Sequence, residues 1–270
     1  MATSNYKNAK ICDNNHLERA TITAPESSPF VLSNVIDLYN RNKTWKPGTN
    51  TLTIEIDLLS NSQNVSFFCM IGESDAQFKM SNFATVTVKA SSINLFDGSE
   101  PYTATATVGE LGVYLSLSDK ENINGVSYRY WNIEIDDSTN PNDIEIAYMY
   151  LGDNVIIHRN IANGFNYVNL DRSLTGISDS GKFFTLKKPE QTFIRALSYQ
   201  NMSKEDKDNL VESLRRVGIN KPFLFTLDPD ECREGFDFSV RPCFFDGRVP
   251  VVTQVVRDIY STTYNLREVM

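Results

Sequence analysis

Apolar and polar residues alternate along several short segments of the chain, which predicts β-strands buried on one face. The clearest segment is residues 51–58, TLTIEIDL, in which every second residue is leucine or isoleucine. The same period of two occurs over residues 84–88, 113–117, 131–135 and 144–150. Turn-forming Asn, Asp, Gly and Pro residues separate these runs at 60–64, 97–101, 122–125 and 136–143. Many short strands without intervening helices predict an antiparallel sandwich or jelly roll.

One segment, residues 203–217, has the pattern of an amphipathic helix. Ser203 can cap its N-terminus, and Asp206 three residues later completes a pair resembling a capping box. Apolar residues recur at 210, 211, 214 and 217, and Gly218 follows as a stop signal. Further strands are expected on both sides of this helix, at 192–199, 222–227, 236–245, 249–256 and 258–266.

These patterns predict a mostly-β protein with two folded parts. We expect an N-terminal arm over residues 1–19, a jelly-roll β-sandwich over 20–152 and a connector over 153–180. Residues 181–270 are expected to form a β-rich assembly domain with the single packed helix at about 203–217.

Composition excludes several classes of function. The 270 residues carry a formal net charge of −8, which argues against sequence-independent binding of nucleic acid. No apolar run is long enough to predict a transmembrane helix, and the glycine-rich phosphate loops of nucleotide-binding proteins are missing. There are two histidines, His16 and His158, and neither accompanies a nucleophile motif. We therefore predict a protein that is not an enzyme and holds no cofactor.

Two groups of residues are candidates for ligand binding. Asp136, Asp137 and Asp143 lie in one acidic loop and offer oxygen ligands for Ca²⁺, although such residues also form turns without metal. Trp45 and Tyr102 are candidates for stacking on sugar rings, and core packing is the alternative for Trp45.

Phenylalanine-rich segments supply a further candidate surface. They lie at residues 183–184, 223–225 and 236–245. We expect these side chains in the core, with assembly interfaces as the alternative.

Residues 20–152 resemble the galactose-binding-like jelly roll of discoidin and coagulation-factor C-type domains. The resemblance rests on NVID at 34–37 followed by Trp45, and on residues 51–58, 128–135 (YRYWNIEI) and 144–152 (IEIAYMYLG). It implies a β-sandwich whose loops at one end bind sugars or lipid, commonly with a structural Ca²⁺.

The whole chain also resembles bacteriophage tail proteins, through residues 128–153 and the helix-containing segment 202–229. This resemblance implies a structural component of the virion, in the tail or tail tip and assembled in the host cytoplasm. The implied partners are other virion proteins and further copies in a symmetric homo-oligomer. Two alternatives remain open: a carbohydrate-binding module that attaches to a host-surface glycan, and a polysaccharide-degrading enzyme.

Overall fold

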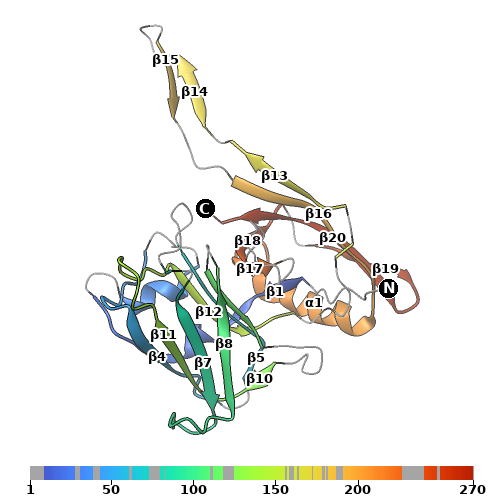
Figure 1. Ribbon diagram of the computed structural model, residues 1–270. Helices are drawn as coiled ribbons and strands as arrows, with labels where there is room; N and C mark the ends of the chain where they lie inside the picture. Colours follow the sequence, from blue (N-terminus) through green and yellow to red (C-terminus); the bar gives the residue numbers. More distant parts are fainter. Residues whose placement is uncertain are drawn as a thin grey trace, which may run out of the picture. The chain divides into compact units, whose positions relative to one another are not determined.

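The computed structural model describes residues 9–269 apart from 28–30, 39–42, 61–62, 73–79, 82, 110–111, 118–124, 156, 158–160, 163, 172, 178–179, 181, 187–190, 227–239 and 248–249. Over these residues the chain is mostly β with a single α-helix, which confirms the predicted fold class. It divides into two compact units (Figure 1): unit 1 comprises Met1–Ile156 with Leu224–Val240, and unit 2 comprises Ile157–Phe223 with Arg241–Met270. No helix in the described part is long and apolar enough to cross a membrane.

Unit 1 is an antiparallel β-sandwich. Its strands pair in the order β2-β12-β6-β9-β8-β7-β11-β4-β3. Strand β8 pairs with β7 through residues 102–106 and with β9 through 107–108, so it passes from one sheet to the other. The nine strands are β2 (Asn14–Asn15), β3 (Thr21–Thr23), β4 (Thr51–Asp57), β6 (Phe67–Ile71), β7 (Thr85–Ser91), β8 (Tyr102–Val108), β9 (Gly112–Ser116), β11 (Tyr130–Asp136) and β12 (Tyr148–Asp153).

The alternation in the sequence places the core of this sandwich. Ile54 on β4 pairs with Ile133 on β11, which pairs in turn with Val88 on β7, and all three are fully buried. Trp131 is buried in phase with Ile133, as the sequence predicts. Side chains from β6, β9 and β12 join the same apolar cluster from the other sheet, so the two inner faces form one core.

Short elements complete unit 1. The 3-10 helices η1 (His16–Arg19) and η2 (Leu32–Ile36) contribute buried leucine and valine side chains, and β5 (Asn64–Val65) pairs with β10 (Val126–Ser127). Strand β1 (Lys10–Cys12) pairs with residues 224–226 of β17 (Phe223–Thr226). Residues 9–19, within the segment expected as an N-terminal arm, therefore carry β1, β2 and η1.

Unit 2 is built around the long strand β20 (Ile259–Glu268). On one side β20 pairs with β16 (Gln191–Met202), which pairs with β13 (Asn166–Leu170). Two strands also pair with β20: β18 (Arg241–Phe245) with its C-terminal part and β19 (Val252–Val256) with its N-terminal part. Strands β14 (Leu174–Ile177) and β15 (Phe183–Leu186) pair with each other, so β13 and β14 lie within the segment expected as a connector.

The helix of unit 2, α1 (Lys204–Val217), confirms the helix prediction. The Asp206 backbone N–H donates to Ser203 Oγ at 3.1 Å, and the Ser203 N–H donates to Asp206 Oδ2 at 3.2 Å. Leu210, Leu214 and Val217 are buried. Gly218 ends the helix with φ +59°, a conformation that side chains other than glycine's rarely adopt.

The phenylalanine segments have different environments. Phe223, Phe225 and Phe245 are buried as expected, whereas residues 236–239 lie outside the described part. The expectation of core packing is wrong for Phe183 and Phe184, which are 84% and 53% exposed. They lie on the two-stranded ribbon of β14 and β15, and all described residues of β15 are exposed.

Candidate functional site

Three chain segments meet at one end of the sandwich in unit 1. Asp136, the last residue of β11, pairs with Thr51 at the start of β4 and with Thr85 at the start of β7. The segment before β4, the segment before β7 and the segment after β11 therefore all leave the sheet at the same end of its strands. We call the described residues of segments 43–50, 80–84 and 136–147 the loop end.

The carboxylate of Asp137 holds two of these segments together. Its Oδ2 accepts hydrogen bonds from the Ser81 backbone N–H at 2.9 Å and from Asn140 Nδ2 at 2.7 Å, and its Oδ1 accepts from the Ser81 hydroxyl. The Asp137 backbone N–H donates to the carbonyl oxygen of Asn50 at 2.8 Å. Asp137 is 2% exposed, so these donors replace the water that would otherwise solvate its charge.

Asn50 fixes the segment that follows β11. Its Nδ2 donates to the carbonyl oxygens of Asn140 and Asn142 at 2.9 and 3.0 Å, and its Oδ1 accepts from the backbone N–H of Ile144 at 3.2 Å. One side chain thus satisfies three backbone groups within residues 140–144, which belong to no strand, and this gives these residues a defined shape.

Phe83 lies on the segment that Asp137 anchors. The turn closes through a hydrogen bond from the Ala84 N–H to the Ser81 carbonyl oxygen at 3.0 Å, and the Phe83 N–H faces Ser81 Oγ at 3.3 Å. Ala84 belongs to the core cluster, whereas Phe83 is 89% exposed. The loop end therefore presents an aromatic ring to solvent, on a turn that Asp137 joins to the segment with exposed Asn142 and Asp143.

Sequence reasoning missed Phe83, although a signal was present. Ala84, Val86 and Val88 alternate in phase towards the core. Phe83 immediately precedes this run and is out of phase with it, so the period of two places its side chain away from the core.

The two residues predicted to stack on sugars do not form a site. Trp45 is fully buried, its backbone pairs with Ile146, and its Nε1 donates to the carbonyl oxygen of Pro25 at 3.0 Å. The sugar-stacking prediction is wrong for Trp45, because neither face of its ring is open, and the core alternative is confirmed. Tyr102 is half-buried and packs against Trp131, with ring centroids 6.2 Å apart. It lies at the end of the strands opposite the loop end.

The described carboxylates of the acidic loop take part in turn-forming hydrogen bonds. In the described part of the chain no three His, Cys, Asp or Glu side chains lie together as a metal-binding group. The oxygens of Asp137 face N–H and O–H donors, which would repel a cation. Asp136 Oδ1 accepts from the Ser138 N–H at 3.2 Å, and Asp143 is exposed. These contacts fit the turn-forming alternative, and the calcium site at Asp136, Asp137 and Asp143 stays a prediction.

Neither histidine is part of the loop end. Nε2 of His16 lies 2.8 Å from the carbonyl oxygen of Asn64, at the opposite end of the sandwich strands, and burial lowers the pKa of its imidazole from the ordinary 6.5. His158 is outside the described residues.

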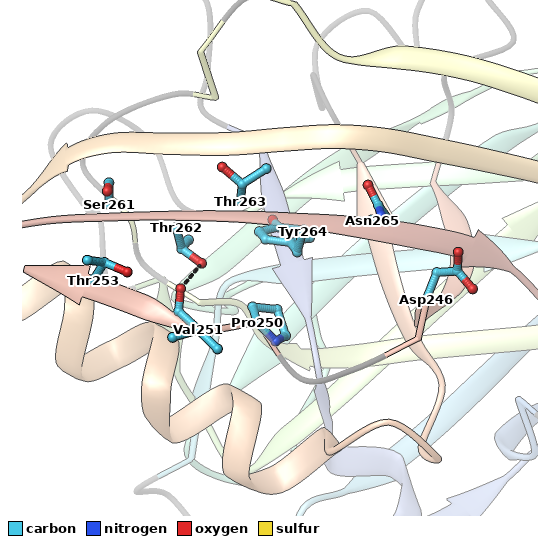
Figure 2. Close-up of a pocket in the computed structure, with 9 residues that line it drawn as sticks. All are labelled: Asp246, Pro250, Val251, Thr253, Ser261, Thr262, Thr263, Tyr264 and Asn265. Atoms are coloured by element: carbon cyan, nitrogen blue, oxygen red, sulfur yellow. Dashed lines mark hydrogen bonds between the residues drawn. The ribbon is translucent and has the colours of Figure 1, made fainter.

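Unit 2 has a pocket of about 360 Å³ at the edge of β20 (Figure 2). It lies where β18 and β19 both meet β20: β18 pairs with residues 266–268 and β19 with 259–262, which leaves 263–265 between them. Hydroxyl, amide and carboxylate side chains dominate its lining, and Thr262 Oγ1 donates to the carbonyl oxygen of Val251 at 3.0 Å. The lining residues are Asp246, Pro250, Val251, Thr253, Ser261, Thr262, Thr263, Tyr264 and Asn265.

Comparison with known proteins yields structural likeness only. No protein-family model matches the chain, and no curated protein matches it. Similar solved structures include one described as SpGH29, at 14% identity and TM-score 0.39 over 52% of this chain and 28% of that one. They also include the family 32 CBM from C. perfringens NanJ in complex with galactose, at 14% identity and TM-score 0.38 over 53% and 98%. A Streptococcus pneumoniae fucose binding module, SpX-3, has 15% identity and TM-score 0.37 over 52% and 98%. The description of unit 1 as a β-sandwich rests on its own strand pairing and not on these similarities.

Proposed function

We propose that unit 1 binds carbohydrate at the loop end and that Phe83 is the platform on which a sugar ring stacks. The observation that carries the proposal is the 89% exposure of Phe83 on a turn held by the buried Asp137. An exposed aromatic side chain on a mobile loop would lose conformational entropy on binding. A turn fixed by several hydrogen bonds lowers that cost, because the ring is already in place.

The neighbouring side chains suit the remainder of a sugar. One face of a pyranose ring is made of C–H groups and packs on an aromatic face, while its hydroxyls need hydrogen-bond partners. Asn142 and Asp143 are exposed on the segment that Asn50 fixes, and Asp137 joins that segment to the Phe83 turn. Amide and carboxylate side chains donate and accept such hydrogen bonds.

The contribution of the ring can be estimated from the area that a sugar would cover. Covering about 80 Å² of the Phe83 ring at about 25 cal/mol per Å² contributes about 2 kcal/mol, which corresponds to about a 30-fold change in Kd. We therefore expect Phe83→Ala to weaken binding by at least about 10-fold.

The test begins with a glycan array probed with the full chain. Galactose and fucose, the ligands named for two of the similar modules, are then titrated by calorimetry along with any glycan found on the array. The matched control is Ile93→Ala, which removes an exposed apolar side chain after β7, at the opposite end of the sandwich.

We expect Phe83→Ala to bind at least about 10-fold more weakly at unchanged Tm and Ile93→Ala to bind as the wild type does. Absence of any bound glycan, or full binding by Phe83→Ala, would overturn the proposal. Release of reducing sugar from a bound glycan would instead support the polysaccharide-degrading alternative.

A structural role in assembly is the second candidate function, and the exposed apolar ribbon of β14 and β15 favours it. A glycan-binding unit joined to an assembly unit is compatible with a surface component of a particle. The virion, its tail and the companion virion proteins remain predictions from the sequence resemblance.

A further inference from the structure

Strands β13 and β16 continue into β14 and β15 as one long two-stranded ribbon (Figure 1). Leu170 pairs with Gln191, and four residues further on Leu174 pairs with Leu186. On the returning side the paired residues, Leu186 and Gln191, are five positions apart. The register between the two sides therefore shifts by one residue. The two pairs of strands are therefore successive parts of one hairpin, with β13 and β14 on its outgoing side and β15 and β16 on its returning side. We call residues 174–186 the β-arm.

The described residues of the β-arm have no apolar core of their own. Residues that pair directly share a face of the ribbon, so Leu174, Leu186 and Phe184 lie on one face and Ile177 and Phe183 on the other. All five side chains are more than half exposed. Each face presents about 300 Å² of apolar surface, at the lower end of the range for the largest patch on a typical monomer.

The ribbon is also short of stabilising contacts. A two-stranded hairpin alone is marginally stable in water, because its side chains are not covered by a third element. One local contact helps: the Phe184 ring lies over Gly176, where an added Cβ would come within 2.6 Å of it. A Cβ at residue 176 would therefore displace the Phe184 ring from this position.

A second unpartnered surface lies at the opposite edge of the same unit. Strand β19 pairs with β20 on one side, whereas β16 and β13 lie on the other side of β20. In the described residues β19 has no further strand beyond it. Val251, Val255 and Val256 are each more than half exposed there.

The strands of both surfaces lack residues that commonly keep sheet edges apart, although Lys182 lies just before β15 and Arg257 just after β19. Natural edge strands are usually protected by charged residues or proline, but β14 (LTGI), β15 (FFTL) and β19 (VTQVV) contain neither. Both surfaces are strand edges flanked by apolar side chains, so they are complementary in hydrogen bonding and in polarity. Because they lie at opposite edges of unit 2, a contact between two copies leaves one surface of each kind open.

We propose that the β-arm of one copy docks on the β19 edge of a second copy of this chain, giving a head-to-tail assembly. Such a contact forms a ring if its rotation closes and a filament if it does not. A contact along one strand edge covers part of both faces of the β-arm and the backbone of that strand, which places the interface at the small end of the known range.

The test uses the full chain and two variants with a charge at one surface each: Phe183→Asp in the β-arm and Val255→Asp on β19. Both side chains are exposed, so folding should be retained, and circular dichroism checks this. Ile93→Asp places the same charge on an exposed apolar position of unit 1 and is the matched control. Sedimentation measures association of each protein and of an equimolar mixture of the two surface variants.

We expect the wild type and Ile93→Asp to assemble, and each surface variant alone to weaken association by more than about 10-fold. The mixture should form dimers and no larger species, because each pair then retains one intact β-arm and one intact β19 edge. A wild type that stays monomeric would overturn the proposal. Continued assembly of Val255→Asp would also overturn it and would indicate a symmetric contact between β-arms.

Discussion

Replacing Asp137 by alanine tests whether its carboxylate is the structural anchor of the loop end. The substitution removes the acceptor for the Ser81 N–H, the Ser81 hydroxyl and Asn140 Nδ2. Hydrogen bonds to charged groups contribute about 1.5–3 kcal/mol each. Water can reach some of the released donors at the edge of the sandwich, so we expect a loss of about 3 kcal/mol in the free energy of unfolding.

For a unit of this size each kcal/mol lowers Tm by about 2–4 °C, so Tm should fall by about 6–12 °C. Asp143→Ala is the matched control. It removes an exposed carboxylate from the same loop and should change stability by less than about 0.5 kcal/mol. Thermal denaturation followed by circular dichroism measures both variants.

The effect of added Ca²⁺ on Tm distinguishes anchoring by hydrogen bonds to Asp137 from binding of a metal ion. We expect the wild-type Tm to be the same with added CaCl₂ and with EGTA, because the Asp137 oxygens already face hydrogen-bond donors. An unchanged Tm in Asp137→Ala would refute the anchoring role. A Tm that Ca²⁺ raises in the wild type, but not in Asp137→Ala, would refute the assignment of these contacts and support the metal site.

Two further predictions concern the scaffold. Burial lowers the pKa of His16 in the folded protein below the ordinary 6.5. As the pH falls below about 6.5, His16 therefore binds a proton more readily in the unfolded chain than in the folded one. The free energy of unfolding should fall over this pH range. His16→Gln should flatten this slope in denaturant titrations from about pH 5.5 to 7.5, and an unaltered slope would contradict the assignment. Ser203→Ala should cost about 1 kcal/mol through loss of the capping box, whereas Ser203→Asp should retain most of the stability; equal Tm values for all three proteins would contradict the capping role.

Strands and helix could be predicted where the local pattern determines burial. The alternation over residues 51–58 places Leu52, Ile54 and Ile56 in the core, and the structure has β4 there. The capping residues and apolar spacing of α1 likewise lie within one segment. Strand β8 was missed because its sequence, YTATATV, alternates between threonine and small alanine and so gives a weak hydrophobic signal.

The contacts that anchor the candidate site could not be predicted because they join distant segments. Trp45 is buried through pairing with Ile146, and Asp137 is satisfied by Ser81; neither partner is near in sequence. Phe183 has the composition of a core residue. Local pattern shows that a face is apolar, but it does not show whether another element covers that face.

NMR titration of the isotopically labelled full chain with a glycan selected on the array tests the central claim most directly. We expect the largest chemical-shift changes at Ser81, Phe83 and Asp143 of the loop end, and their loss in Phe83→Ala. Changes confined to the β20 pocket around Asp246 and Thr263 would contradict the account, because they would place carbohydrate binding in unit 2.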